Sequence, residues 1–164
     1  MKHAVPLALL FCSATAFASD GTITFTGTIT DTSCTISTSN VTVDFGTVAA
    51  SAFKAKGDTT GGRAFQLTLT DCPYESATVR FDGNADAEGK LFQVDSGADN
   101  ASNVGIAIYD ANNVQVLPNS PSSAYVLSKT AANTLNFSAK LQSTADTVNV
   151  GNIAATSNFT IVYP

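Results

Sequence analysis

The residues of this chain with the clearest chemistry are its cysteines. The sequence holds three, Cys12, Cys34 and Cys72, and the first lies inside an apolar N-terminal segment that we expect to be removed. An even pair of cysteines in an exported protein predicts a disulfide. A disulfide between Cys34 and Cys72 would close the loop between them, and closing a loop of that length stabilises a fold by roughly 4 kcal/mol in the chain-entropy model. We therefore expect Cys34 and Cys72 to form a structural disulfide.

The N-terminal segment, residues 1–18, has the features of a secretory signal. Lys2 and His3 precede an apolar run over residues 4–11, and small residues follow, ending Ala16-Phe17-Ala18. The run is too short to cross a bilayer as a stop-transfer helix. Cleavage after Ala18 would leave 164 − 18 = 146 residues, a length that suits one domain.

The remaining chain lacks the residues that most enzymes and nucleic-acid-binding proteins use. The single histidine lies in the signal, which excludes Ser-His and Cys-His catalysis and histidine metal sites. Without Lys2 the chain carries 8 − 1 = 7 basic and 13 acidic residues, a net charge of −6 with no basic patch. Residues 82–88 resemble a calcium loop, but Ala87 and Gln93 replace its required glycine and glutamate. We expect no catalytic residue, cofactor or metal, and no partner among nucleic acids.

Apolar residues alternate with polar ones along most of the chain, which predicts β-strands. Gly, Asn, Asp and Pro separate the runs, as they do in antiparallel proteins with one buried face per strand. We expect an all-β sandwich. The residue ranges expected to form strands are 22–30, 33–37, 41–45, 64–71, 77–82, 104–109, 114–117, 135–142 and 157–163. Segments 46–62, 83–103 and 118–134 should be surface connections, with room for one helical turn.

The first of these runs, T-I-T-F-T-G-T-I-T over residues 22–30, has two very different faces. Threonine occupies every even position, whereas Ile23, Phe25, Gly27 and Ile29 share the other face. The apolar face needs a groove to cover it. Because the run precedes the first retained cysteine, it could form an edge strand of its own domain or an arm that reaches another molecule.

Taken together, these features resemble the subunits of chaperone–usher fimbriae, specifically the type 1 pilin group of major fimbrial subunits. The resemblance rests on an ordered set that spans the mature chain. That set comprises the arm G-T-I-T-F-T-G-T-I-T-D-T-S-C, the stretch F-Q-L-T-L-T-D-C with the second cysteine, V-G-I-A-I-Y-D at 104–110, L-N-F-S-A-K-L at 135–141, Gly151 fourteenth from the C-terminus and Tyr163 in the penultimate position.

The resemblance implies an incomplete immunoglobulin-like β-sandwich, completed by a donor strand from a neighbouring subunit. Residues 19–33 would form the N-terminal donor-strand arm and residues 34–164 the pilin domain. Ile23, Phe25 and Ile29 would fill pockets of a neighbour's groove, with Gly27 where the groove is shallow. Four residues would belong to the groove and chaperone-binding strand: Gly151, Phe159, Ile161 and Tyr163.

The implied partners are identical or related pilin subunits, a periplasmic chaperone and an outer-membrane usher. The protein would be exported through the periplasm to the cell surface, not embedded in the membrane, and would form a fimbrial filament that supports cell adhesion. The main alternative is an autonomous secreted β-sandwich that binds a glycan or a protein and uses its own first strand to complete its sheet. A secreted hydrolase with two carboxylates is a more distant alternative.

Overall fold

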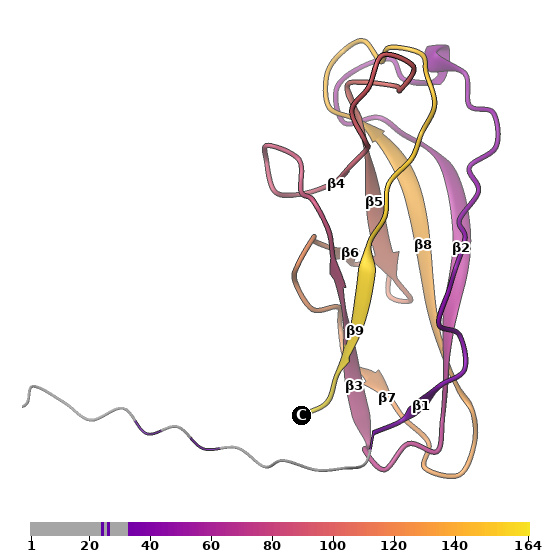
Figure 1. The fold of residues 1–164 in the computed structure, drawn as a ribbon, viewed down its shortest axis with the longest axis vertical. Coiled ribbons are helices and arrows are strands. Elements are labelled where there is room, and N and C mark those ends of the chain that lie inside the picture. Colours follow the sequence, from indigo (N-terminus) through magenta and orange to yellow (C-terminus); the bar gives the residue numbers. More distant parts are fainter. Residues whose placement is uncertain (1–23, 25, 27–32) are drawn as a thin grey trace, which may run out of the picture. The chain divides into compact units, whose positions relative to one another are not determined.

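The computed structural model describes Thr24, Thr26 and residues 33–164. The chain divides into two units, Met1–Thr30 and Asp31–Pro164. All secondary structure among the described residues lies in the second unit, where Figure 1 shows strands joined by loops, some of them long. In chain order the elements are β1 (Thr35–Ile36), the 3-10 helix η1 (Ala50–Ala52), β2 (Thr59–Thr70), β3 (Ser76–Asp82), β4 (Phe92–Gln93), β5 (Val104–Asp110), β6 (Gln115–Val116), β7 (Tyr125–Val126), β8 (Asn133–Ser143) and β9 (Asn158–Val162).

The strands form two sheets, which confirms the predicted all-β class. The larger sheet has the order β1-β2-β8-β5-β4, with β6 also paired to β5, and the smaller has the order β7-β3-β9. Every pairing between these strands is antiparallel. The two longest strands, β2 and β8, lie side by side in the middle of the larger sheet (Figure 1, magenta and orange).

The core lies between the two sheets and follows the alternation of the sequence. Along β8 buried and more exposed residues alternate over the whole strand, because successive side chains point to opposite faces. Phe137 of β8 stacks on Phe65 of β2 at 5.5 Å between ring centroids, and it makes a T-shaped contact with Phe81 of β3 at 5.1 Å. These rings join the two sheets through one aromatic cluster.

Some predicted elements differ from the structure. The run 41–45 was expected to be a strand, but it forms no strand here, because its main chain pairs with no described strand. Strand β2 begins at Thr59, inside the segment expected to be a connection, and η1 supplies the one helical turn. The two-residue strands β4 and β7 were not predicted. The first run, 22–30, lies outside the described residues apart from Thr24 and Thr26, both exposed.

Candidate functional site: a groove beside the C-terminal strand

The last strand of the chain, β9, is an edge strand. It pairs only with β3 among the described strands, with Phe159 opposite Phe81 and Ile161 opposite Val79. Figure 1 shows β9 in yellow at the border of the smaller sheet. An edge strand presents main-chain N–H and C=O groups that can pair with a further strand. This edge of the sandwich is therefore open to strand addition.

A groove of about 620 Å³ runs beside β9. Residues 155–159 form one side, and residues 39–45 form the opposite side, which we call the N-terminal wall; every residue of this wall except Asp44 lines the groove. The floor consists of seven apolar residues from the sheets: Phe65, Leu67, Phe81, Phe92, Ile106, Ile108 and Ala139. Ile36 also lines the groove. None of the residues that line the groove is charged.

The floor of the groove is part of the hydrophobic core itself. Leu67, Phe81 and Phe92 are at most 5% exposed and belong to the main core cluster. A groove that reaches such residues opens onto the interior of the sandwich. It can be covered only by apolar side chains, because a polar group placed there would lose its hydration without gaining a partner. An extended chain with one apolar face meets this requirement.

Three of the residues assigned to the groove strand by resemblance lie together on β9 or just after it. Phe159 lines the groove, and Phe159, Ile161 and Tyr163 are all partly buried against the main core cluster. They alternate with Thr160 and Val162, which are exposed. The three side chains thus share the inward face of the strand, while the unpaired main-chain edge runs along its side.

Tyr163 also makes specific contacts near the disulfide. Its hydroxyl accepts a hydrogen bond from the main-chain N–H of Cys34 at 3.2 Å, and its ring stacks on Tyr74 at 4.4 Å between centroids. Burial raises the pKa of Tyr163, partly opposed by the hydrogen bond from Cys34, so the phenol is neutral at ordinary pH. Cys34 and Cys72 form the predicted disulfide and are almost fully buried.

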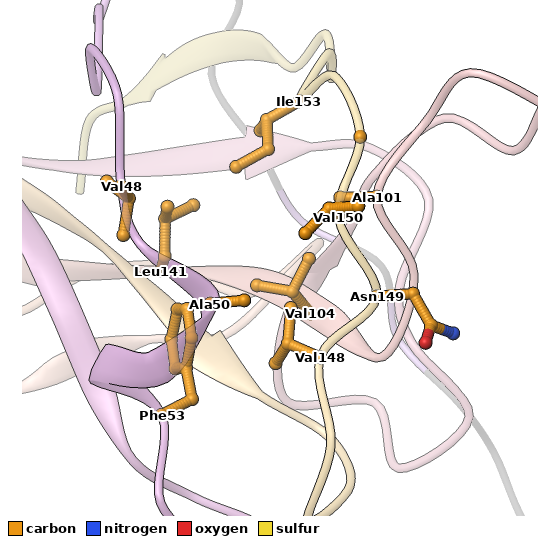
Figure 2. Close-up of a pocket in the computed structure, with 11 residues that line it drawn as sticks. Val48, Ala50, Phe53, Ala101, Val104, Leu141, Val148, Asn149, Val150 and Ile153 are labelled. Atoms are coloured by element: carbon orange, nitrogen blue, oxygen red, sulfur yellow. The ribbon is translucent and has the colours of Figure 1, made fainter.

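Gly151 lies apart from these residues, seven positions before the start of β9. It lines a smaller cavity of about 110 Å³ (Figure 2). A Cβ atom at Gly151 would overlap main-chain atoms of Asn100 and Ala101, so the position accepts only glycine without a backbone shift. The close approach pairs the two segments, since the main-chain N–H of Ala101 donates to the carbonyl of Asn152 at 2.9 Å.

The smaller cavity continues the direction of the groove. Ala155 lines the groove, and Ile153, two positions earlier in the chain, lines the cavity. On β8, Ala139 lines the groove and Leu141 lines the cavity. Val48, shortly after the N-terminal wall, contributes to the same cavity, and Figure 2 shows Val48, Leu141 and Ile153 around it. Apolar positions therefore extend past the end of the groove towards the segment that precedes β9.

The donor-strand residues Ile23, Phe25, Gly27 and Ile29 lie outside the described residues, so their role stays a prediction. Sequence reasoning missed the N-terminal wall and the floor as site residues. The signal that could have found the wall is the alternation of Val41, Val43 and Phe45, which was interpreted as an ordinary strand. The described residues contain no group of His, Cys, Asp and Glu side chains suited to a metal ion. They also contain no helix long and apolar enough to cross a membrane.

The fold and the groove together define an immunoglobulin-like sandwich that lacks one strand. Residues 23–164 match the family described as fimbrial protein. A relative, long polar fimbria protein A of Salmonella typhimurium, is 38% identical over 165 residues, covering 95% of this chain and 92% of the relative. The chain therefore belongs to the fimbrial protein family and is a fimbrial subunit, which confirms the resemblance seen in the sequence.

Solved structures agree with this assignment. The crystal structure of an antigen and type I fimbria protein of Burkholderia pseudomallei is 34% identical, with a TM-score of 0.64, covering 82% of this chain and 91% of that chain. A chaperone–usher pilus structure has a TM-score of 0.68 and covers 93% of this chain and 100% of that chain. Its identity is 21%, so it supports the fold alone.

Proposed function

We propose that this subunit polymerises by donor-strand exchange, in which the N-terminal arm of one copy fills the groove beside β9 of the next. The observation that carries the proposal is the uncharged groove of about 620 Å³ next to the unpaired edge of β9. Strand addition to such an edge combines main-chain hydrogen bonds, which give affinity, with side-chain pockets, which give specificity.

The arm suits the groove chemically. Its apolar face carries Ile23, Phe25 and Ile29, and its other face carries only threonine hydroxyls, which remain in contact with water. Burying three large apolar side chains contributes about 5–9 kcal/mol, at roughly 1.5–3 kcal/mol each. Thr156, Ser157 and Asn158 line the groove beside its apolar residues and could meet the borders of the arm. The arm and the groove thus have matching polarity.

The open groove also supports a proposal for the route by which the subunit reaches the filament. A fold that exposes apolar side chains along a groove, as Ile36 and Val41 are exposed here, is prone to aggregate unless something covers them. A periplasmic chaperone that lends a strand to β9 would provide this cover after export, and an outer-membrane usher would be the place where the arm of the next subunit replaces it. The finished polymer is a filament on the cell surface that supports adhesion.

A gel experiment with the full exported chain tests the proposal. Unheated samples should show a ladder of detergent-resistant multimers that collapses on boiling, and a variant lacking residues 19–30 should show none. Two matched arm variants refine the test, because Phe25 and Thr26 are neighbours on opposite faces. Phe25→Asp should abolish the ladder and Thr26→Asp should preserve it. A full chain that stays monomeric in unheated and boiled samples, and is folded and stable without a chaperone, would instead mean that the arm completes its own domain and would favour an autonomous binding module.

A further inference from the structure

Arg63 breaks the apolar pattern on the inner face of β2. Phe65 and Leu67 of this strand line the groove floor, and strand alternation places Arg63 on the same face. Its cross-strand neighbour on β8, Ala139, is buried and also lines the groove. A charged residue therefore stands at the edge of an apolar groove, where the pattern would place another apolar side chain.

The guanidinium group of Arg63 binds main-chain carbonyl groups. Its Nε donates to the carbonyl oxygen of Asp44 at 2.9 Å, and Nη2 donates to that of Phe45 at 2.9 Å. The remaining terminal nitrogen donates to the carbonyl oxygen of Gly62 at 3.1 Å. No carboxylate among the described residues forms an ion pair with Arg63. Such charge-assisted bonds are stronger than those between neutral groups.

The N-terminal wall has little other main-chain support. Between the bond from the Ser37 N–H to the Thr68 carbonyl and the 3-10 turn that begins at Ala49, no main-chain group of residues 38–48 bonds to another described main-chain group. The side chain of Asp44 accepts from the Gly46 N–H at 2.8 Å, which is a local turn contact. Among the described residues, Arg63 is therefore the group whose hydrogen bonds tie the end of this wall, at Asp44 and Phe45, to the larger sheet.

A β-bulge directs Arg63 to this position. The pairing of β2 with β8 shifts register between Thr60 and Arg63, where Gly61 and Gly62 intervene. Gly61 has a φ of +70°, and a Cβ atom there would touch Val48 and Phe45. Bulges re-aim the side chains that follow them. Gly61 thus allows the left-handed backbone of the bulge beside Phe45 and Val48, and the bulge turns Arg63 onto the carbonyl groups.

We propose that Arg63 is a positioning residue for strand insertion: it fixes the N-terminal wall at the spacing that an incoming donor strand requires. This inference rests on the proposed donor-strand exchange. A preorganised wall lowers the ordering cost of association. Once a strand is inserted, its own ladder bonds and side chains hold the wall, and the guanidinium contacts matter less. Arg63 should therefore accelerate insertion and have little effect on release.

The test follows insertion and release separately. The full chain is mixed with a fluorescent peptide that copies residues 19–31. Unheated gels then follow the amount of peptide that the chain captures over time. Arg63→Ala should slow capture by at least roughly tenfold, the change that corresponds to about 1.4 kcal/mol. Arg63→Lys should remain close to Arg63→Ala, because an ammonium group cannot bind two carbonyl groups in a planar fork. Arg80→Lys is the matched control, since Arg80 binds Asp82 on β3, and it should behave as wild type.

Release and thermal stability separate a positioning role from a general structural one. In the peptide-filled state, Arg63→Ala and Arg63→Lys should release peptide and unfold like the wild type. If both variants capture peptide at the wild-type rate, or if the filled state is destabilised as much as capture is slowed, the inference fails. If Arg63→Ala does not fold, the capture rate of Arg63→Lys decides the test. A wild-type chain that captures no peptide would instead overturn the proposed function, and this inference with it.

Discussion

The hydroxyl of Tyr163 accepts a hydrogen bond from the main-chain N–H of Cys34, and this contact joins the end of the last strand to the first residue of the disulfide. The two residues are 129 positions apart in the sequence. The stacked ring of Tyr74 holds the Tyr163 side chain in place. The part of the domain that directly follows the arm is therefore tied to the strand that borders the groove.

Replacement of Tyr163 by phenylalanine should lower the stability of the domain modestly. The variant keeps the ring and its stacking on Tyr74 but loses one hydrogen bond, which is worth about 0.5–1.5 kcal/mol. Tyr163→Ala removes the ring as well and should cost about 2–4 kcal/mol more, in the range of large-to-small core changes. Urea unfolding of the arm-filled protein measures both. Equal stability of Tyr163→Phe and wild type would show that the bond contributes nothing.

Replacement of Gly27 should obstruct polymerisation. Gly27 shares the face of the arm with three large apolar residues, and the resemblance places it where the groove is shallow. Gly27→Asn should slow the formation of boiling-sensitive multimers by at least about tenfold. The neighbouring Thr26→Asn, on the hydroxyl face, is the matched control and should assemble normally. A Gly27→Asn chain that assembles as fast as its control would contradict a shallow position.

Asp110 should make the domain sensitive to acid. The residue is 5% exposed, and this burial raises the pKa of its carboxyl group. Hydrogen bonds from Ser123 and from the main-chain N–H groups of Val114 and Asn112 outweigh the burial and hold the pKa below its usual value. A lowered pKa means that the contribution of Asp110 is complete above the unfolded value, about 3.9, and is lost as the pH falls through the folded value.

The Asp110→Asn variant tests this expectation. At neutral pH it should be less stable by about 1.5–3 kcal/mol, the range for hydrogen bonds to a charged group. The stability difference between wild type and variant should shrink below about pH 4, as the wild-type carboxylate takes up its proton. Chemical unfolding at several pH values measures the difference. A difference that stays constant down to pH 2 would show that another group controls acid sensitivity.

Gly151→Ala should destabilise the segment before β9. The added Cβ would overlap the main chain of Asn100 and Ala101, and forced overpacking of this kind costs about 1–3 kcal/mol. Gly62→Ala is the matched control, because its Cβ would lie 3.8 Å from Lys140 Cγ, an ordinary contact. Thermal unfolding distinguishes the two variants. If both glycine variants unfold alike, the close approach at Gly151 is not required.

The sequence predicted the long strands well because their side chains record which face is buried. In β8, Leu135, Phe137 and Leu141 alternate with polar residues, and the structure confirms this pattern. The two cysteines predicted the disulfide from compartment chemistry alone. Strands of two residues, such as β4 and β7, are too short to show a period and are defined by their pairing partners.

The groove could not be predicted from alternation, because it results from a strand that is missing. Val41, Val43 and Phe45 show the pattern of a half-buried strand, yet the structure gives them no described ladder partner and places them on a groove wall. The local sequence of a strand does not show whether its edge pairs with a neighbouring strand. Arg63 was overlooked for a related reason, since its role depends on main-chain carbonyl groups about 18 positions away.

The absence of charged residues from the lining of the groove has a consequence for the environments in which the filament can function. Dissolved ions weaken contacts between exposed charges, with a screening length of about 8 Å at physiological ionic strength. A contact between subunits that consists of apolar side chains and main-chain hydrogen bonds contains no charges for these ions to screen. The connection between one subunit and the next should therefore hold equally well in fresh water and in brine.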